Sequence, residues 1–458
     1  MNKKCNDVIV IGFALFAMFF GAGNLLLPPA LGHLSGRNWV LAFSGFLLTG
    51  VGMPILGIVS MGKCGGRLSD FIKNINGIFG TFFIIFVMLI IGPLFALPRL
   101  AATTFEIAVA PMKLGINSVF FSLIFFGITL FFVLTPTNVV DRVGKILTPA
   151  LIIMTAMFIV KGVMTPIGKA AAPSADKLFL RGFKEGYQTM DALASIIFAT
   201  IAISAIGAKG YGDRKSLFQM SVYTGMLACF GLALVYGGLM YVGATGSRVL
   251  PEQLSRSAIV VRSSELLWGS WGRVVLGLAI GLACLTTAIG LIATVGKYFS
   301  ERFRNDISYR AAVIIITVIS FFLSIFGVDA IIYVAGPILE IVYPVAIVLI
   351  IMNLFSDYIP NRYFYGGAVF GTLCISVLQG IVAAEDLING FLVKIGAMPM
   401  MGREALSFNT TVSMLRKLPL ERIGVPWLLP AIAASLLFGF GFMLLEKTKR
   451  APSIHGGV

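Results

Sequence analysis

The sequence is poor in charged residues. Asp, Glu, Lys and Arg make up only 12% of its 458 residues, while 58% are hydrophobic; a soluble chain of this length would be about one quarter charged. A soluble protein needs a polar exterior, which this composition cannot supply. The shortage of charge therefore excludes a water-soluble globular protein and predicts a polytopic membrane protein.

Several functional signatures are also missing. The chain has two histidines, His33 and His455, and it contains neither a GxxxxGK[ST] nor an HExxH motif. An ATP-driven pump and most membrane enzymes are thereby disfavoured, so we expect no enzyme activity and no cofactor. The five cysteines have no framework spacing, so we expect no disulfides.

Long apolar runs fill most of the chain. A membrane-spanning helix needs about 20 apolar residues, and twelve such spans can be drawn, which predicts an all-α protein with about 12 transmembrane helices. The expected spans are roughly 7–32, 38–62, 77–108, 117–135, 146–163, 186–208, 217–244, 273–296, 311–327, 329–355, 363–384 and 425–445.

Basic residues gather in short loops between these spans. The net charge is +15, yet the Lys and Arg residues form no continuous stripe of the kind that binds nucleic acid. Short basic loops are typical of the cytoplasmic side, so we expect a cell-membrane protein with both termini in the cytoplasm. Examples are Lys63, Arg67, Lys73, Arg142, Lys145, Lys209, Arg214, Lys215, Lys297, Arg302, Arg304 and Arg310.

Three long outer loops are expected at 164–185, 245–272 and 385–424. Within the second, residues 251–268 have apolar positions at helical spacing. This pattern predicts an amphipathic helix that lies along the outer surface.

The first span is interrupted by Gly21, Ala22, Gly23 and Asn24, and two prolines follow within one turn. In lipid, a broken helix is tolerated where its freed backbone groups meet protein, water or a ligand. The exposed N–H groups suit a carboxylate and the exposed carbonyls suit a cation. A simple glycine packing face is the alternative interpretation.

The sixth span begins with Thr189, Asp191 and Ser195. An ionisable residue at membrane depth is a functional candidate, although Asp191 could instead lie near the outer boundary and cap a half-helix. Breaks in spans one and six are typical of an inverted repeat of five plus five helices. We therefore expect one transporter domain, 1–458, with repeats at 7–163 and 186–355 and two extra helices at 363–445.

The eighth span places Ala283, Thr286 and Thr287 on one helix face. Two hydroxyls and a carbonyl could converge there on a hard cation such as Na⁺. Threonines in membrane helices also bond their own backbone or a neighbouring helix, so this pattern alone leaves both interpretations open.

Three further charged residues fall within spans. Arg99 and Glu106 are seven residues apart, on one face of span three, where they can compensate each other as a structural pair or act as an outer gate. Glu340 lies near the middle of span ten without an obvious local partner. It is a candidate coupling carboxylate or a protonated residue that bonds between helices.

Three motifs together resemble the branched-chain amino acid:cation symporter family (BrnQ type), which is related to amino acid–polyamine–organocation transporters. They are FFGAGNLLLPP, GPLFALPR followed by FE, and GYQTMDALA, and the resemblance runs over essentially the whole chain. It implies a leucine-transporter-like fold and bacterial uptake of leucine, isoleucine and valine, usually by symport with Na⁺.

The resemblance also implies roles for particular residues. Gly21, Ala22, Gly23 and Asn24 match the stretch that contacts the substrate carboxylate and the ion. The carbonyls of Ala17 and Phe20, with Ala283, Thr286 and Thr287, match a sodium site between helices one and eight. A proton-coupled transporter of the same fold, in which Glu340, Asp191 or Glu106 titrates, remains an alternative. A channel or membrane sensor is disfavoured because no selectivity filter or signalling domain is present.

Overall fold

The computed structural model describes residues 3–134, 139–303, 306–385, 387, 389 and 409–450, and these are helical apart from short connections. Each of the twelve predicted apolar stretches is helical. The helices are α1 (Lys3–Phe19), α2 (Ala22–Ser35), α3 (Trp39–Leu47), α4 (Met53–Lys63), α5 (Leu68–Ile72), α6 (Gly77–Leu89), α7 (Ala96–Thr104), α8 (Ser118–Leu134), α9 (Val139–Met164), α10 (Leu178–Gln188), α11 (Asp191–Ala208), α12 (Arg214–Gly246), α13 (Arg256–Trp268), α14 (Ser270–Arg302), α15 (Tyr309–Ser324), α16 (Val328–Leu354), α17 (Arg362–Ala383), α19 (Asn409–Lys417) and α20 (Leu428–Arg450).

The outer surface of the bundle is apolar. Among the described residues, seven helical segments are long and apolar enough to cross a membrane, and four shorter apolar helices accompany them. Large apolar side chains such as Phe131, Phe230 and Leu437 are more than half exposed on the outside. Exposed apolar area on this scale is typical of a lipid-facing surface, so the chain is an all-α polytopic membrane protein, as predicted.

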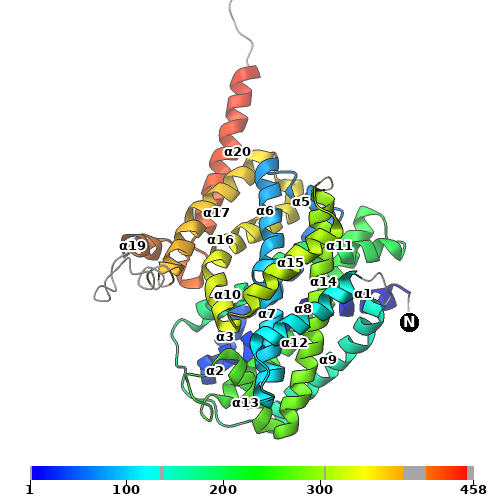
Figure 1. Ribbon diagram of the computed structural model, residues 1–458. Coiled ribbons are helices and arrows are strands. Elements are labelled where there is room, and N and C mark those ends of the chain that lie inside the picture. Colours follow the sequence, from blue (N-terminus) through cyan, green and yellow to red (C-terminus); the bar gives the residue numbers. More distant parts are fainter. Residues whose placement is uncertain are drawn as a thin grey trace, which may run out of the picture.

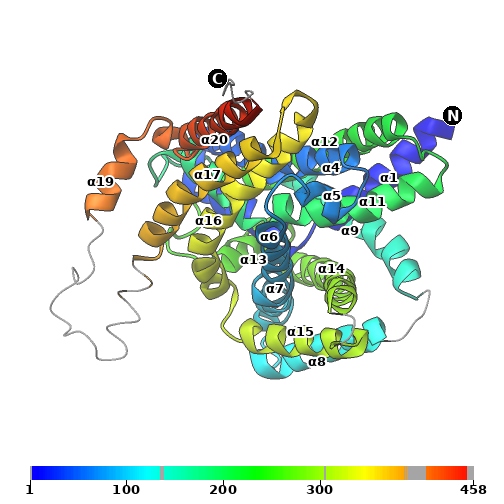
Figure 2. The same ribbon diagram turned by 90° about the horizontal axis from the view of Figure 1, so that it is seen from above.

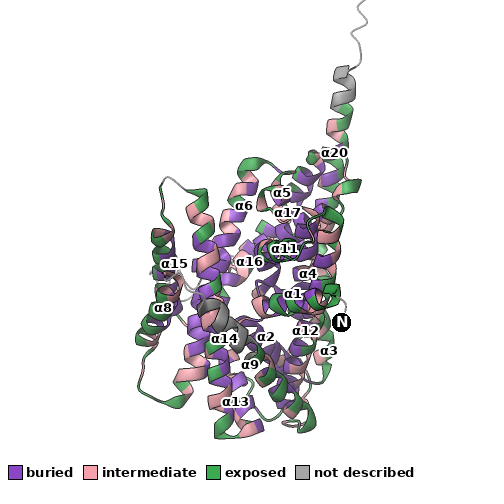
Figure 3. Ribbon diagram, turned by 90° about the vertical axis from the view of Figure 1, so that its right-hand side faces the viewer, coloured by how far each residue is buried: buried purple, intermediate pink, exposed green. Residues whose placement is uncertain are grey.

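The helices pack side by side in one bundle (Figure 1). The pair α8 and α15 lies at one edge and the pair α17 and α20 at another (Figure 2). Buried residues concentrate on the helices between these edges, including α2, α11, α12 and α16 (Figure 3). The helix α1 runs out to the side of the bundle toward the N terminus (Figures 1 and 2).

Polar caps begin several helices. The side chain of Asn76 accepts hydrogen bonds from the backbone N–H groups of Ile78 and Phe79 at the start of α6. Asp213, Ser255, Ser308 and Asn361 do the same for α12, α13, α15 and α17. Such caps satisfy N–H groups that have no partner within the helix, and so they set where each helix begins.

The sixth predicted span is longer than its hydropathy indicates. The prediction of an outer loop over 164–185 is wrong from Leu178 onward, because α10 begins there and leads into α11. Arg181, Lys184 and Glu185 lower the hydropathy of this stretch. Its opposite face, with Phe183 and Tyr187, is buried.

Glycines allow α10 to pack closely against α3. A Cβ atom at Gly182 would overlap the main-chain oxygen of Ala42, and one at Gly45 would overlap that of Phe179. The two backbones therefore approach as closely as small residues allow, which is common between membrane helices.

The helix predicted within 251–268 is present as α13, which packs on α2 and α14. Its position along the outer surface stays a prediction. Of the third predicted loop, 385–424, residues 386, 388 and 390–408 lie outside the described part of the chain.

Candidate functional site

Two broken helices meet in the middle of the molecule. The first break separates α1 from α2 at Phe20 and Gly21, and the second separates α10 from α11 at Thr189 and Met190. Residues from both breaks line one small central cavity of about 50 Å³, which is room for one or two water molecules.

The first break lies slightly earlier than predicted. Gly21 is extended, and α2 already begins at Ala22, so the predicted interruption at 21–24 narrows to Phe20 and Gly21. A Cβ atom at Gly21 would make ordinary contact, 3.8 Å from the Thr287 side chain, whereas one at Gly23 would overlap the Arg99 guanidinium. Gly23 therefore leaves room for Arg99.

The second break depends on Met190, which adopts a left-handed conformation with φ of 62°. The Thr189 hydroxyl donates to the carbonyl oxygen of Gly186 at 2.9 Å and accepts from the backbone N–H of Asp191 at 3.2 Å. Asp191 is thereby the first residue of α11 and is 5% exposed. Asp191 lines the central cavity.

A polar cluster joins the two breaks. The side-chain amide of Asn24 donates to the main-chain oxygen of Phe19 across the first break, and to Asp191 Oδ2 at 2.9 Å. It also contacts the hydroxyl of Tyr236, which in turn donates to Asp191 Oδ2 at 3.4 Å. The predicted residues Asn24 and Asp191 are thus brought together.

Two tyrosines belong to this region although no sequence pattern singled them out. Tyr236 lies in the middle of α12, and the Tyr343 hydroxyl of α16 accepts from the backbone N–H of Ala192 at 3.2 Å. A tyrosine inside an apolar span is the one signal that could have pointed to them, because its hydroxyl needs a partner when buried.

Arg99 and Glu106 do not form the predicted pair. Arg99 is 4% exposed, lines the central cavity, and donates from Nη1 to the carbonyl oxygen of Gln188 at the end of α10. Glu106 accepts from the Ser257 hydroxyl and, at 2.9 Å, from the backbone N–H of Val328. Seven residues advance a helix by about 10 Å, and a π-helical turn at Phe105–Val109 changes the helical spacing around Glu106, so each side chain finds a nearer partner.

Glu340 has a partner after all. Its Oε1 lies 2.7 Å from Nζ of Lys184. Lys184 belongs to α10, at a position where the sequence predicted the outer loop 164–185. The pair could therefore not be predicted.

Ser195 lies outside the central cavity. Its hydroxyl donates to the carbonyl oxygen of Ala192 at 2.7 Å, and its side chain packs where a Cβ atom of Gly57 would be. Ala194, one position earlier, lines the cavity instead.

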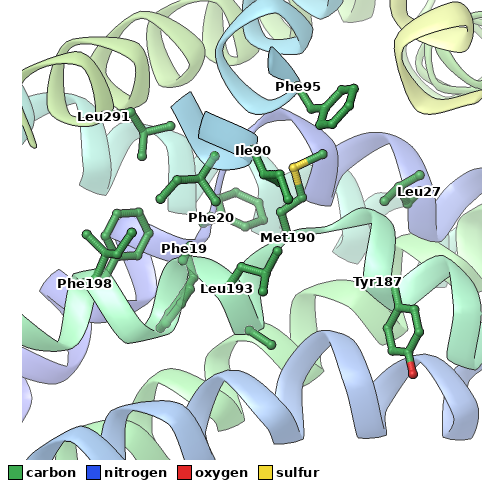
Figure 4. Packing of buried hydrophobic residues seen from close by; sticks show 14 of the residues in the cluster. Phe19, Phe20, Leu27, Ile90, Phe95, Tyr187, Met190, Leu193, Phe198 and Leu291 are labelled. Carbon is green, nitrogen blue, oxygen red and sulfur yellow. The ribbon is translucent and has the colours of Figure 1, made fainter. Parts of the chain in front are cut away.

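A second, larger cavity adjoins the central one. This vestibule of about 1020 Å³ lies between α1, α9, α11 and α14. Met18, Phe198, Thr287 and Leu291 line both cavities, so they form the partition between them. Phe198 packs edge to face on Phe19, at 5.6 Å between ring centroids, and Figure 4 shows Leu291 beside this pair.

The predicted cation residues lie along the vestibule. Ala17 lines it from α1, and Thr286 and Thr287 line it from α14. The Thr286 hydroxyl donates to the carbonyl oxygens of Leu282 and Ala283, at 3.1 and 3.0 Å. The other two predicted cation residues, Ala283 and Phe20, are buried and do not line the vestibule.

On the opposite side of the central cavity, α13 is fastened by ion pairs. Arg256 contacts Glu185 of α10 at 3.0 Å and Asp329 of α16 at 3.3 Å. We call these three residues the outer latch, because α13 lies in the loop 245–272 that the sequence predicts on the outer side. Sequence reasoning missed it because α13 was interpreted as a surface helix.

A family model described as branched-chain amino acid transport protein matches residues 4–443. The chain is 39% identical over 440 residues to the branched-chain amino acid permease BraB of Bacillus subtilis, with 94% of each chain covered. It is 34% identical over 459 residues to the branched-chain amino acid transport system 2 carrier protein of Pseudomonas aeruginosa, with 98% of this chain and 99% of the relative covered.

Solved structures share the fold at low sequence identity. A Na⁺-coupled sialic acid symporter, in a substrate-bound outward-open state, matches with a TM-score of 0.57 at 11% identity, over 93% of this chain and 89% of that one. Mhp1, a nucleobase-cation-symport-1 family transporter in a closed conformation with bromovinylhydantoin bound, matches with a TM-score of 0.59 at 12% identity, over 96% and 92%.

Proposed function

This chain belongs to the family of branched-chain amino acid transport proteins, and on that premise we propose that it imports leucine, isoleucine and valine by symport with Na⁺. It is a transport protein and not an enzyme. Substrate and Na⁺ are both cargo, and no resident cofactor is required.

The meeting of the two broken helices carries this proposal. The break in α1 and α2 and the break in α10 and α11 bring four helix ends beside one cavity. Polar side chains meet backbone groups at these ends, as Asn24 meets the carbonyl oxygen of Phe19 and Arg99 that of Gln188. Such ends suit the charged groups of an amino acid and a coupling ion. We place the substrate there, against Gly21, Ala22, Gly23 and Asn24 of the first break and Thr189 and Asp191 of the second.

The apolar partition fits a branched side chain. Met18, Phe198 and Leu291 separate the central cavity from the vestibule. An isobutyl or sec-butyl group that points toward them would bury its surface against apolar atoms. One methylene is worth only about 1–3 kcal/mol, so valine and isoleucine should compete well with leucine.

We place Na⁺ between α1 and α14. The carbonyls of Ala17 and Phe20 and the oxygens of Ala283, Thr286 and Thr287 would supply a cage of hard ligands. The support is positional, because Ala17, Thr286 and Thr287 share the vestibule wall. The Na⁺-coupled symporter of the same fold adds to that support.

Alternating access would connect the central cavity to each side in turn. With the termini in the cytoplasm, the vestibule is the inner route and the latch at α13 closes the outer one. In this scheme 7–163 and 186–355 are the two inverted repeats, and Glu106 and Glu340 contribute to gating at the outer side.

Uptake of labelled leucine into proteoliposomes tests the proposal. We expect an inward Na⁺ gradient to drive uptake, choline substitution to abolish it, and a protonophore to leave it unchanged. Excess isoleucine and valine should inhibit, whereas lysine and glutamate should not. Uptake that survives choline but collapses with the protonophore would establish proton coupling instead, and inhibition by lysine or glutamate would exclude the proposed substrate class.

A further inference from the structure

Two opposite charges face the central cavity without touching each other. Arg99 and Asp191 are 4% and 5% exposed, and both line the cavity. No ion pair joins them among the residues that the structure describes. Burying unlike charges without pairing them costs several kcal/mol in lost hydration. We therefore expect this arrangement to serve a function.

The Arg99 guanidinium has more hydrogen-bond donors than the described residues accept. It carries five N–H donors in a planar fork. In the described part of the chain, one acceptor meets it, the carbonyl oxygen of Gln188. Gly23 leaves the space that the guanidinium fills, since a Cβ atom there would overlap it.

The Asp191 carboxylate is held from the other side. Asn24 and Tyr236 both contact its Oδ2 atom, from α2 and α12. These donors fix the direction of the carboxyl group, and neither of them carries a positive charge. The cavity therefore presents a cation on one wall and an anion on another.

A zwitterion is the ligand that matches this pattern. An α-amino acid carries its carboxylate and its ammonium on the same carbon, and each group would meet the opposite charge. We propose that Arg99 binds the substrate α-carboxylate through its fork and that Asp191 binds the α-ammonium. This inference rests on the proposed function and assigns the two charged contacts within it.

The same assignment places the side chain of the substrate. With its head between Arg99 and Asp191, the branched chain points to the apolar partition of Met18, Phe198 and Leu291. The central cavity holds about 50 Å³, so binding must widen it by moving this partition toward the vestibule. Selection for a free amino acid head then comes from the charges, and selection for an apolar side chain comes from the partition.

The competing explanation is structural. Arg99 would neutralise the carbonyl end of α10, and Asp191 would serve as an anion at the first turn of α11, where it complements the helix dipole. Removal of either charge would then weaken the protein for every ligand alike.

Analogues that lack one charge separate the two explanations. Binding of leucine, leucinamide and 2-hydroxy-4-methylpentanoate is measured by competition with labelled leucine on purified protein in nanodiscs. Leucinamide lacks the carboxylate charge, and the hydroxy acid lacks the ammonium. Wild-type protein should prefer leucine over each analogue by at least about tenfold, since a hydrogen bond to a charged group contributes that much.

We expect each of the two variants to lose its preference for leucine over a different analogue. In Arg99→Gln, the preference for leucine over leucinamide should fall to within about twofold, while the preference over the hydroxy acid persists. In Asp191→Asn, the reverse should hold. Arg99→Lys, which keeps the charge but loses the fork, should retain an intermediate preference over leucinamide.

Two results would overturn the assignment. One is wild-type protein that binds leucinamide or the hydroxy acid as tightly as leucine, which is decided without any variant. The other is a loss of affinity in Arg99→Gln and Asp191→Asn that is equal for all three ligands. If wild-type protein binds no leucine, the proposed function fails instead.

Discussion

The two sides of the central cavity are built from different chemistry. Toward the vestibule, the boundary is Met18, Phe198 and Leu291 with one hydroxyl, that of Thr287. Toward α13, the boundary is helix α10, clamped by glycines and held by the outer latch. Apolar groups can separate without leaving a charge unpaired, whereas the latch cannot open without breaking ion pairs. The vestibule side should therefore open more easily than the side at α13.

The glycine contact between α3 and α10 gives the largest expected effect. Gly182→Ala should destabilise the folded protein by about 1–3 kcal/mol, because the added methyl group overlaps the backbone of α3. Thermal unfolding of purified protein measures this. Gly290→Ala is the matched control, since a Cβ atom there meets nothing within 4 Å on the wall of the vestibule. Equal melting temperatures for the two variants would show that α10 is not clamped.

Opening the outer latch gives the next largest effect. Arg256→Gln leaves Glu185 and Asp329 without their shared cation, which should raise access to the central cavity from the α13 side about tenfold. The expected size lies between that of an exposed and a buried pair, because the Arg256 side chain is 29% exposed. The readout is the rate at which a cysteine at Ala194, in a protein without other cysteines, reacts with an impermeant maleimide.

Arg262→Gln is the control for the latch. Arg262 lies on the same helix, and its ion pair, with Glu265 at 2.9 Å, stays within α13. It should leave the labelling rate unchanged. If both variants label alike, loss of a positive charge rather than release of the latch explains the result.

The cation site should show a moderate effect. Replacing both Thr286 and Thr287 by Ala removes two hydroxyls from the proposed cage, and the Na⁺ concentration for half-maximal leucine uptake should rise severalfold. Thr294→Ala removes a hydroxyl from the same vestibule wall, where it donates to Gly290. A similar rise in that control would mean that the vestibule lining, and not a cation cage, was disturbed.

The smallest effect is expected where α1 is fastened on the vestibule side. Lys209 lies 3.3 Å from Asp7, and the Lys209 side chain is 47% exposed whereas that of Asp7 is 4% exposed. Asp7 also accepts from the Tyr211 hydroxyl at 3.1 Å, so it keeps a partner when Lys209 is replaced. Lys209→Gln should therefore change the labelling of the Ala194 cysteine from the vestibule side by no more than about twofold. Lys297→Gln, whose partner Glu301 lies on its own helix, sets the baseline. A change as large as that of Arg256→Gln would contradict the proposed asymmetry.

The apolar helices could be predicted because the signal for each one, a run of apolar residues, lies in consecutive positions of the sequence. Twenty apolar residues in a row identify a span without knowledge of its neighbours, and the glycines before Pro28 and Pro29 marked the first break. No glycine indicates the second break, because the residue with the left-handed backbone conformation there is Met190. The charges of α10 concealed the half-helix before it, because they lower hydropathy while its other face is buried.

The site could be predicted only in part. Asn24 and Asp191 were identified separately by their polarity within apolar spans, but their hydrogen bond joins residues 167 positions apart. The partners of Arg99, Glu106 and Glu340 lie on other helices, so no spacing rule within one helix could identify them. Arg256 sits in an amphipathic segment, where a basic side chain is ordinary, and only its position between Glu185 and Asp329 distinguishes it.

The outer latch has a further consequence, which concerns the surrounding solution. Its side chains are partly exposed, Asp329 to 49%, so we expect dissolved ions to screen the attraction between them. The screening length shortens from about 30 Å at 0.01 M salt to about 8 Å at 0.15 M. The apolar partition has no charges to screen. The balance between the two faces of the transporter should therefore depend on the ionic strength of the medium on the α13 side, apart from any role of Na⁺ as a coupled ion.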